Sequence, residues 1–177
     1  NEHSDAGFAR VTPRRLDAEQ LVDGLAQVLG QRPSFNGYPQ GLRAVQLPGT
    51  NAILPRYKKP SSADVFLKLF GKPDRQLTCE CERMGQTHLG QAFHLVSGPM
   101  LHQMISSSGN RLGRLADSGA GHSELIDELY WSTLGRAPKE AEESAALELF
   151  SGAGTKRAAL EDLAWALVNS KEFLLRR

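Results

Sequence analysis

Apolar residues, many of them leucine, recur at helical spacing through most of the chain, and capping residues separate one run from the next. The clearest run follows Asp17, because Gln20 stands three residues later in the spacing of a capping box. Gly30 comes directly after its last apolar position, where a glycine commonly ends a helix. The pattern therefore predicts a helix between these residues, with one inward stripe formed by Leu21, Leu25, Val28 and Leu29.

Two further helices are predicted on either side of the segment that contains both cysteines. Ser61 is placed to cap the first, and Thr87 is placed to cap the second. The positions expected to face the core are Val65, Phe66, Leu69 and Phe70 on the first helix, and Leu89, Ala92, Phe93 and Val96 on the second.

Pro99 is expected to open a separate helix, because the first helical position needs no backbone N–H. A short turn is expected around Leu112 and Leu115. The inward positions of the helix after Pro99 are Met100, Leu101, Met104 and Ile105.

Residues 123–175 show three consecutive helical patterns with short connections. Ser123 is expected to cap the first, Pro138 to open the second, and the third to run from Thr155 to about Leu174. Short connections make neighbouring helices reverse direction, so these residues are predicted to form a three-helix antiparallel unit.

Two tryptophans lie at the edges of apolar stripes in this region, Trp131 and Trp165. We expect both in the core rather than on an exposed binding platform. A polymer-binding role would need exposed aromatic residues, for which Tyr38, Tyr57 and Trp131 are the candidates.

Residues 31–60 contain five prolines and three glycines at intervals that exclude a long helix. We expect an irregular arm, in which residues 42–47 could form one short extended piece. A loop pinned to the core is favoured over a ligand-covering arm. With residues 1–15 as an extended lead-in, the chain is predicted to fold as one all-α domain over 16–175, an irregular bundle of about six to eight helices.

Composition narrows the possible partners. The 177 residues are 40% hydrophobic and 23% charged, which is ordinary for a globular domain. The formal net charge of +1 argues against nucleic-acid binding, which usually requires a basic stripe. No apolar run approaches the roughly 20 residues that span a bilayer, so no transmembrane segment is expected in this chain.

Cys79 and Cys81 have the one unusual spacing that suggests chemistry. A disulfide between them would close a tight, strained and therefore labile ring. With Arg83 and His94 beside them, they are the candidates for a redox or hydrolytic site. Buried structural thiols are the favoured interpretation, ahead of a disulfide and of metal ligation, because free cysteines are among the most buried residues. Thiol titration of the native protein with and without reductant would separate a redox site from a non-catalytic module, and two thiols that label only in denaturant would exclude the redox site.

Metal binding at the same place would need ligands besides Cys79 and Cys81, of which His88 is the nearest. None of the nearby histidines has the four-residue spacing that places two imidazoles on one helix face. No nucleophile elbow, phosphate loop or dinucleotide fingerprint is present. We therefore expect no metal and no cofactor.

Motifs distributed from about Arg14 to Leu174 resemble one known family. They include Gly41-Leu-Arg-Ala-Val-Gln-Leu-Pro48, Phe70-Gly-Lys-Pro-Asp-Arg75, Cys79-Glu-Cys-Glu-Arg83, Gln91-Ala-Phe-His-Leu95 and Leu163-Ala-Trp-Ala-Leu-Val-Asn-Ser-Lys-Glu-Phe-Leu174. In combination they are similar to the planctomycete-type C-terminal domain of unknown function, the PSD-one family.

The resemblance implies a piece of a large exported protein that also carries cytochrome-c-like or immunoglobulin-like domains. It implies an exported, periplasmic or cell-envelope location, with other domains of the parent protein or envelope proteins as partners. The family has no established reaction, so no catalytic residue can be transferred. A non-catalytic interaction or scaffold module is therefore the leading hypothesis, and a redox or hydrolytic enzyme around Cys79 and Cys81 is the alternative.

Overall fold

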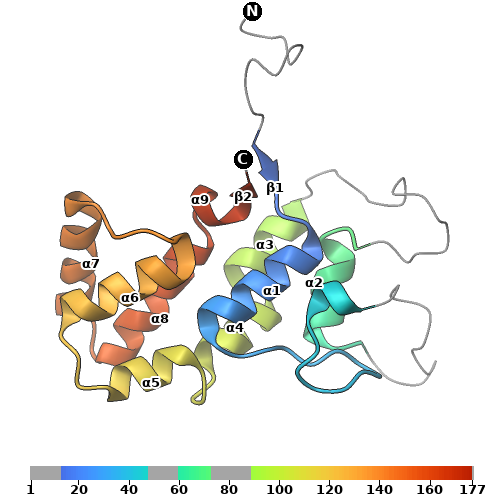
Figure 1. Cartoon of the computed structure of the whole chain (residues 1–177), viewed down its shortest axis with the longest axis horizontal. Helices are drawn as coiled ribbons and strands as arrows, with labels where there is room; N and C mark the ends of the chain where they lie inside the picture. The colour runs from blue at the N-terminus through green and yellow to red at the C-terminus, as the bar shows by residue number, and fades with distance from the viewer. Residues whose placement is uncertain (1–12, 48–59, 73–88, 177) are drawn as a thin grey trace, which may run out of the picture.

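The structure, a computed structural model, describes residues 13–47, 60–72 and 89–176 (Figure 1). These residues form an all-α bundle, as predicted. Helix α1 (Ala18–Leu29) lies at its centre. It packs against elements from both halves of the chain, namely η2 (Ala44–Gln46), α2 (Ser62–Leu69), α4 (Pro99–Ser106), α5 (Arg111–Asp117) and α6 (His122–Leu134). Its inward stripe of Leu21, Leu25, Val28 and Leu29 is buried, which confirms the pattern predicted from the sequence.

The ends of α1 are set by the residues that the sequence indicates. The backbone N–H of Asp17 donates to Oε1 of Gln20 over 3.2 Å, as a capping box requires. Gly30 has a φ of 63°, and its N–H donates to the carbonyl oxygen of Ala26. This left-handed conformation suits glycine and ends the helix.

The arm that follows α1 returns along it from Gln31 to Leu47. The prediction of a short extended piece at residues 42–47 is wrong, because Ala44–Gln46 form a short 3-10 helix, η2. The Asp23 carboxylate accepts hydrogen bonds from the N–H groups of Ala44 at 2.7 Å and Val45 at 3.3 Å. A carboxylate on α1, about twenty residues away in sequence, thus caps this turn. The rest of the predicted arm, residues 48–59, lies outside the described residues.

Helix α2 (Ser62–Leu69) begins at the predicted cap, where Ser61 Oγ accepts from the N–H of Asp64 over 3.1 Å. Phe66 and Phe70 are buried and their rings stack with centroids 4.0 Å apart. Val65, which was expected to be buried, is exposed because the core-facing positions on this helix are Ala63, Phe66, Leu67 and Phe70.

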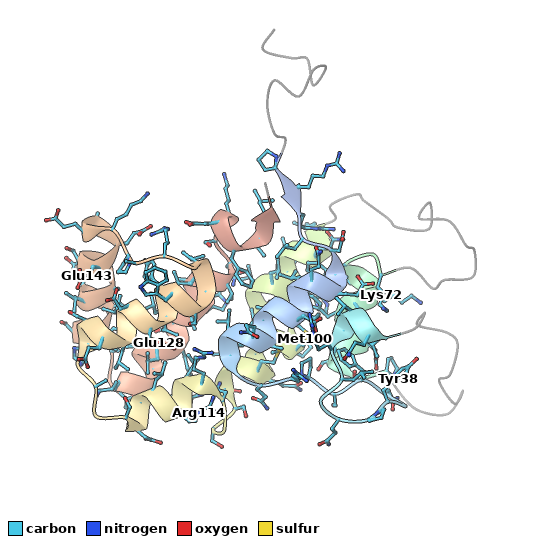
Figure 2. All side chains as sticks on the ribbon, viewed as in Figure 1. Tyr38, Lys72, Met100, Arg114, Glu128 and Glu143 are labelled. Carbon is cyan, nitrogen blue, oxygen red and sulfur yellow. The ribbon has the colours of Figure 1, made fainter. Side chains whose placement is uncertain are left out.

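Helices α3 (Leu89–Ser97) and α4 (Pro99–Ser106) are separate, with Pro99 at the start of α4 as predicted. All four expected inward positions of α4 are buried, among them Met100, labelled in Figure 2. Gly98 makes the junction possible, because a Cβ there would lie 2.2 Å from the carbonyl oxygen of His94. Thr87, the predicted cap of α3, lies outside the described residues.

Asn110 and Arg157 join α4, α5 and α8 (Lys156–Val168). Residues Arg111–Asp117 form the helix α5, where only a short turn was expected, because the fully buried Asn110 caps it. Asn110 Oδ1 accepts from the N–H of Gly113 at 3.0 Å and from Arg157 Nη1 at 3.1 Å. Its Nδ2 donates to the carbonyl oxygens of Met104 and Ile105, both at 2.7 Å. A single asparagine therefore satisfies the end of one helix and the start of the next.

Helices α6 (His122–Leu134), α7 (Glu140–Gly152) and α8 (Lys156–Val168) pack against one another on one side of the molecule (Figure 1). The first begins two residues earlier than expected, at the cap Gly121 rather than Ser123, and Glu124 accepts from the Gly121 N–H over 3.1 Å. The second begins after Lys139, one residue past Pro138.

The last predicted helix is two helices. α8 ends at Val168, and the side chain of Ser170 then accepts from the N–H of Phe173, capping the short helix α9 (Lys171–Leu174). Two short strands, one from each end of the domain's described residues, then pair with each other. Strand β1 (Arg14–Arg15) is antiparallel to β2 (Leu175–Arg176), with Arg14 opposite Arg176. In the described parts of the chain no helix has the length and apolar character needed to cross a membrane.

Candidate functional site

Cys79, Cys81, Arg83 and His88 lie outside the described residues. His94 is on α3 and is partly buried. Within residues 13–47, 60–72 and 89–176, no three His, Cys, Asp or Glu side chains come together in a way that could hold a metal ion. Three surface features of the described residues are candidates for binding or catalysis instead.

The first surface is the face of α3 that was expected to be buried. Leu89 is 74% exposed, Phe93 60% and Val96 54%, and Ala92 is exposed between them. The predicted orientation of this helix is therefore wrong.

The orientation of α3 is fixed by Gln91 and Leu95, which point inward. Gln91 is 2% exposed, its Nε2 donates to the carbonyl oxygen of Leu69 over 2.9 Å, and its Oε1 accepts from Arg15. A glutamine is costly to bury unless it is hydrogen-bonded, and both ends of this amide are satisfied. These partners turn the four apolar side chains of the opposite face outward.

Trp165 extends this surface from α8. It is 39% exposed, and its indole Nε1 donates to the carbonyl oxygen of Val96 at 3.0 Å. The expectation that Trp165 lies in the core is therefore wrong, and so is the same expectation for Trp131, which is 57% exposed. We call the surface formed by Leu89, Ala92, Phe93, Val96 and Trp165 the α3 patch.

A second feature is an apolar groove between α6, α7 and α8, with a volume of about 620 Å³. Arg136 lies at its rim, where its Nη1 and Nη2 donate to the two carboxylate oxygens of Glu142 at 2.7 and 2.8 Å. The same guanidinium donates to both oxygens of Glu172, at 2.8 Å each, and lies 5.6 Å from the ring centroid of Tyr130. Both carboxylates are bound in the two-pronged geometry that favours arginine over lysine.

These contacts shift the pKa values of the ionisable side chains that line the groove. The hydrogen bonds from Arg136 hold the pKa of Glu142 at about 2 and lower the pKa of Glu172. Burial, followed by the nearby Glu142 charge, raises the pKa of Tyr130. A general acid of the carboxylate type needs a raised pKa, so the shifts at Glu142 and Glu172 are opposite to that role. The sequence gives no signal for this cluster, because Glu142 and Glu172 lie thirty residues apart.

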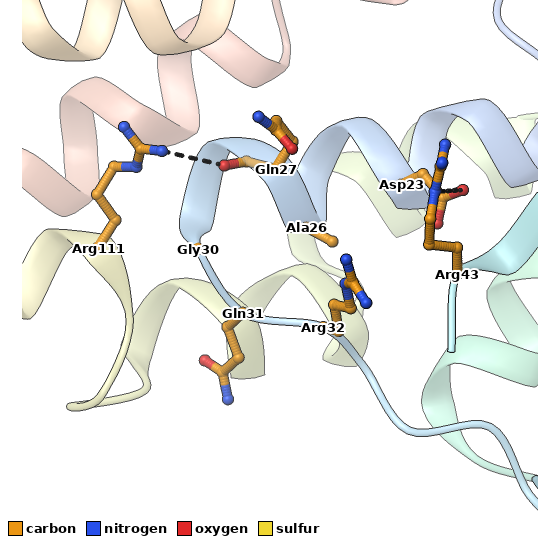
Figure 3. Close-up of a pocket in the computed structure, with 8 residues that line it drawn as sticks. All are labelled: Asp23, Ala26, Gln27, Gly30, Gln31, Arg32, Arg43 and Arg111. Atoms are coloured by element: carbon orange, nitrogen blue, oxygen red, sulfur yellow. Dashed lines mark hydrogen bonds and ion pairs between the residues drawn. The ribbon is translucent and has the colours of Figure 1, made fainter. Parts of the chain in front are cut away.

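A third feature is a hollow of about 500 Å³ at the C-terminal end of α1 (Figure 3). Three arginines line it, Arg32, Arg43 and Arg111, together with Asp23 and the last turns of α1. In this view Arg111 and Arg43 stand at opposite ends and Arg32 lies between them. We call it the basic hollow. The sequence gives no signal for it, because its charged residues come from separate segments.

A buried ion pair joins the residues that follow α2 to α1. Lys72, labelled in Figure 2, is 5% exposed and its Nζ lies 3.4 Å from Oε1 of Glu19 on α1. The same Nζ donates to the carbonyl oxygen of Leu47 at 3.3 Å. Buried charges of this kind persist only when they are paired and hydrogen-bonded, so Lys72 ties the end of α2 firmly to the core.

The sequence matches a known protein family. The family model of PSD1, described as a protein of unknown function (DUF1553), matches residues 2–150. The chain belongs to this family. The match confirms the resemblance seen in the sequence motifs and covers the α3 part of the α3 patch and the basic hollow. It ends at Phe150, so α8 and α9, with Trp165 and the Leu163–Leu174 motif, follow the matched region of this PSD1 domain. Neither a curated protein nor a solved structure matches the chain.

Proposed function

We propose that this PSD1 domain is a non-catalytic interaction module that docks onto another domain of its parent protein through the α3 patch. The observation that carries the proposal is the exposure of Leu89, Phe93 and Val96, at 54% or more each, along one face of one helix. Single exposed apolar residues are normal on protein surfaces, but a contiguous apolar face marks an interaction site.

The size of the patch favours a partner in the same polypeptide. A stable interface between free proteins buries about 1,200–2,000 Å², which requires about twenty residues on each side. The α3 patch has five residues. Interfaces between domains of one chain are smaller, because the linker supplies an effective concentration on the millimolar scale. A modest apolar face is therefore sufficient when the partner is tethered.

The chemistry of the patch also indicates what the partner presents. An aromatic ring, two branched aliphatic side chains and a half-exposed indole contain no charge, so the matching surface should be apolar at its centre. Phe93 is expected to contribute most to binding, because buried aromatic rings at the centre of an interface dominate its energetics.

Hydroxyl-radical footprinting tests the proposal on the parent protein and on the isolated 177-residue chain. Phe93 should be modified readily in the isolated chain and be protected at least fivefold in the parent protein, with Leu89 and Val96 changing in parallel. The reference site is Trp131, which is exposed on α6, away from α3, and should react equally in both proteins. Equal reactivity of Phe93 in both proteins, or strong protection already in the isolated chain, would exclude docking at this face.

A substitution gives an independent test. Phe93→Asp should release the domain in the parent protein, which limited proteolysis detects as faster cleavage of the linker. Val65→Asp is the matched control, because Val65 is an exposed apolar residue on α2, outside the patch. Unchanged proteolysis of Phe93→Asp, with its thermal midpoint also unchanged, would contradict the proposal.

We also propose that the parent protein is exported and resides in the periplasm or cell envelope, and that residues 16–175 act as one unit within it. Family membership supports the first statement through the resemblance to exported planctomycete-type proteins. Contacts of α1 with both halves of the chain support the second. Cell fractionation with an antibody against this domain tests the location. Recovery only with cytoplasmic markers would overturn it.

A further inference from the structure

The basic hollow at the end of α1 has more positive charge than its structural contacts use. Asp23 is its acidic lining residue, and that carboxylate is already satisfied by the N–H groups of Ala44 and Val45 and by Arg43 Nε at 3.5 Å. Arg111 has a carboxylate of its own, since its Nη1 lies 2.6 Å from Oε1 of Glu128. Three guanidinium groups thus share two carboxylates.

Because Arg43 pairs with Asp23 and Arg111 pairs with Glu128, Arg32 is the third arginine of the basic hollow. Within the described residues its hydrogen-bond partner is the carbonyl oxygen of Gly41, a neutral group, and it forms no ion pair there. Arg32 is exposed, and it lies between the other two arginines in Figure 3. Its charge is therefore available to a ligand.

Unused donors face the same space. The Arg43 side chain is 55% exposed, and in the described structure its Nε is the nitrogen that contacts Asp23, which leaves both Nη groups available. The Nε of Arg111 is buried and has no hydrogen-bond partner in the described structure, although buried donors are nearly always satisfied. Protein atoms cover this nitrogen, so the donors that a ligand in the hollow can reach are those of Arg32 and Arg43.

We propose that the basic hollow binds a small organic phosphate or sulfate ester. Guanidinium groups match the oxygens of tetrahedral anions, with planar donors placed to bind two oxygens at once. A volume of about 500 Å³ lies within the range of small-molecule pockets and exceeds what a bare ion would fill. The organic part of the ester would lie along Ala26 and Gly30, which carry no charge and line the same space.

A purely structural role predicts something different. The C-terminal end of a helix has a partial negative charge, and Arg111 Nη2 donates to the carbonyl oxygen of Gln27 there at 3.4 Å. If the arginines only neutralised this end, their loss would lower stability and added anions would have no specific effect. The ligand proposal instead predicts saturable binding that depends on Arg32 and Arg43.

Isothermal titration calorimetry of the 177-residue chain, at constant ionic strength, distinguishes the two. The probes are glucose 6-phosphate and glucose 6-sulfate, with inorganic phosphate and sulfate as bare anions and glucose as the uncharged control. We expect saturable binding of at least one ester, and no binding of glucose. An ester that binds more tightly than its inorganic anion supports the proposal, and equal affinity overturns it, because the organic part then contributes nothing to binding.

The variants Arg32→Gln and Arg43→Gln should each weaken binding about tenfold. Lys171→Gln is the matched control, because it removes the same charge from the exposed surface of α9 and should leave binding unchanged. Circular dichroism checks that each variant is folded. The proposal is overturned if no anion binds in a saturable manner, or if Lys171→Gln weakens binding as much as the two arginine variants.

Discussion

The indole nitrogen of Trp165 donates to the carbonyl oxygen of Val96 over 3.0 Å, and this bond links α8 to the end of α3. The two residues are 69 positions apart, so the bond reports on the tertiary arrangement rather than on either helix alone. It also holds the half-exposed ring of Trp165 next to Val96, which makes the α3 patch a surface shared between two helices.

Replacing Trp165 by Phe should test this link. The aromatic ring is retained and the donor is lost, so we expect a decrease of about 1 kcal/mol in the free energy of unfolding. Chemical denaturation measures it. Trp131→Phe is the control, because Trp131 is exposed and its indole donates to no group in the described structure, so that its change should be close to zero. Equal losses for the two variants would show that the bond contributes nothing.

The Arg136 cluster should make stability depend on pH. Arg136 lowers the pKa of Glu142 from 4.5 to about 2 and lowers the pKa of Glu172. A carboxylate whose pKa is lower in the folded state stabilises the fold above its unfolded pKa, and that contribution is lost as the pH falls toward the folded pKa. The free energy of unfolding should therefore decline between about pH 4.5 and pH 2.

The variant Arg136→Gln should show a smaller decline over the same range, because both carboxylates then return toward their usual pKa. Urea unfolding at pH 6, 4.5 and 3 measures the difference, and high salt should reduce it since the cluster is partly exposed. Arg114→Gln serves as the control, because Arg114 bonds a backbone carbonyl and forms no ion pair in the described structure. A wild-type pH profile in Arg136→Gln would refute the assignment.

Asn110 should be among the most sensitive polar positions in the chain. Its side chain is fully buried and bonds two carbonyl oxygens, the N–H of Gly113 and Arg157. Asn110→Ala removes an N-cap and leaves buried groups unsatisfied, so we expect a loss of about 3 kcal/mol. Asn169→Ala, which removes one exposed bond to the Trp165 carbonyl, should cost less than about 1 kcal/mol in the same denaturation experiment.

The Lys72–Glu19 pair should behave as a unit. Lys72→Met leaves the Glu19 carboxylate buried without this partner, which typically costs about 3–5 kcal/mol. The double variant Lys72→Met/Glu19→Gln should recover much of that loss, because no uncompensated charge remains. A double variant as unstable as the sum of its single variants would mean that the two side chains act independently.

The sequence predicts best where a helix is defined by its own neighbours. Asp17, Gln20 and Gly30 act within one or two turns, so the ends of α1 were predictable from spacing alone. The fold class follows from the same local signals. Prediction from the sequence fails where a distant group determines the local structure, as at η2, whose N–H groups are capped by Asp23 of α1.

The face of α3 shows the same limit for function. Apolar spacing correctly identifies a one-sided helix, but it cannot tell whether another element covers that side. Gln91 finds its partners at Arg15 and Leu69, far away in the chain, and this makes the less apolar side the buried one. The basic hollow is not predictable from the sequence for a related reason, since Arg32, Arg43 and Arg111 come together only in the folded chain.

The two-residue pairing of β1 with β2 has a mechanical consequence. Arg14 lies opposite Arg176 and Arg15 opposite Leu175, so the two ends of the domain's described residues lie side by side. A pulling force applied through them would load the backbone hydrogen bonds one after another, as in opening a zipper, rather than all together in shear. Under tension the domain should therefore unfold first at the β1–β2 pairing and at α9, while the helices around α1 remain folded.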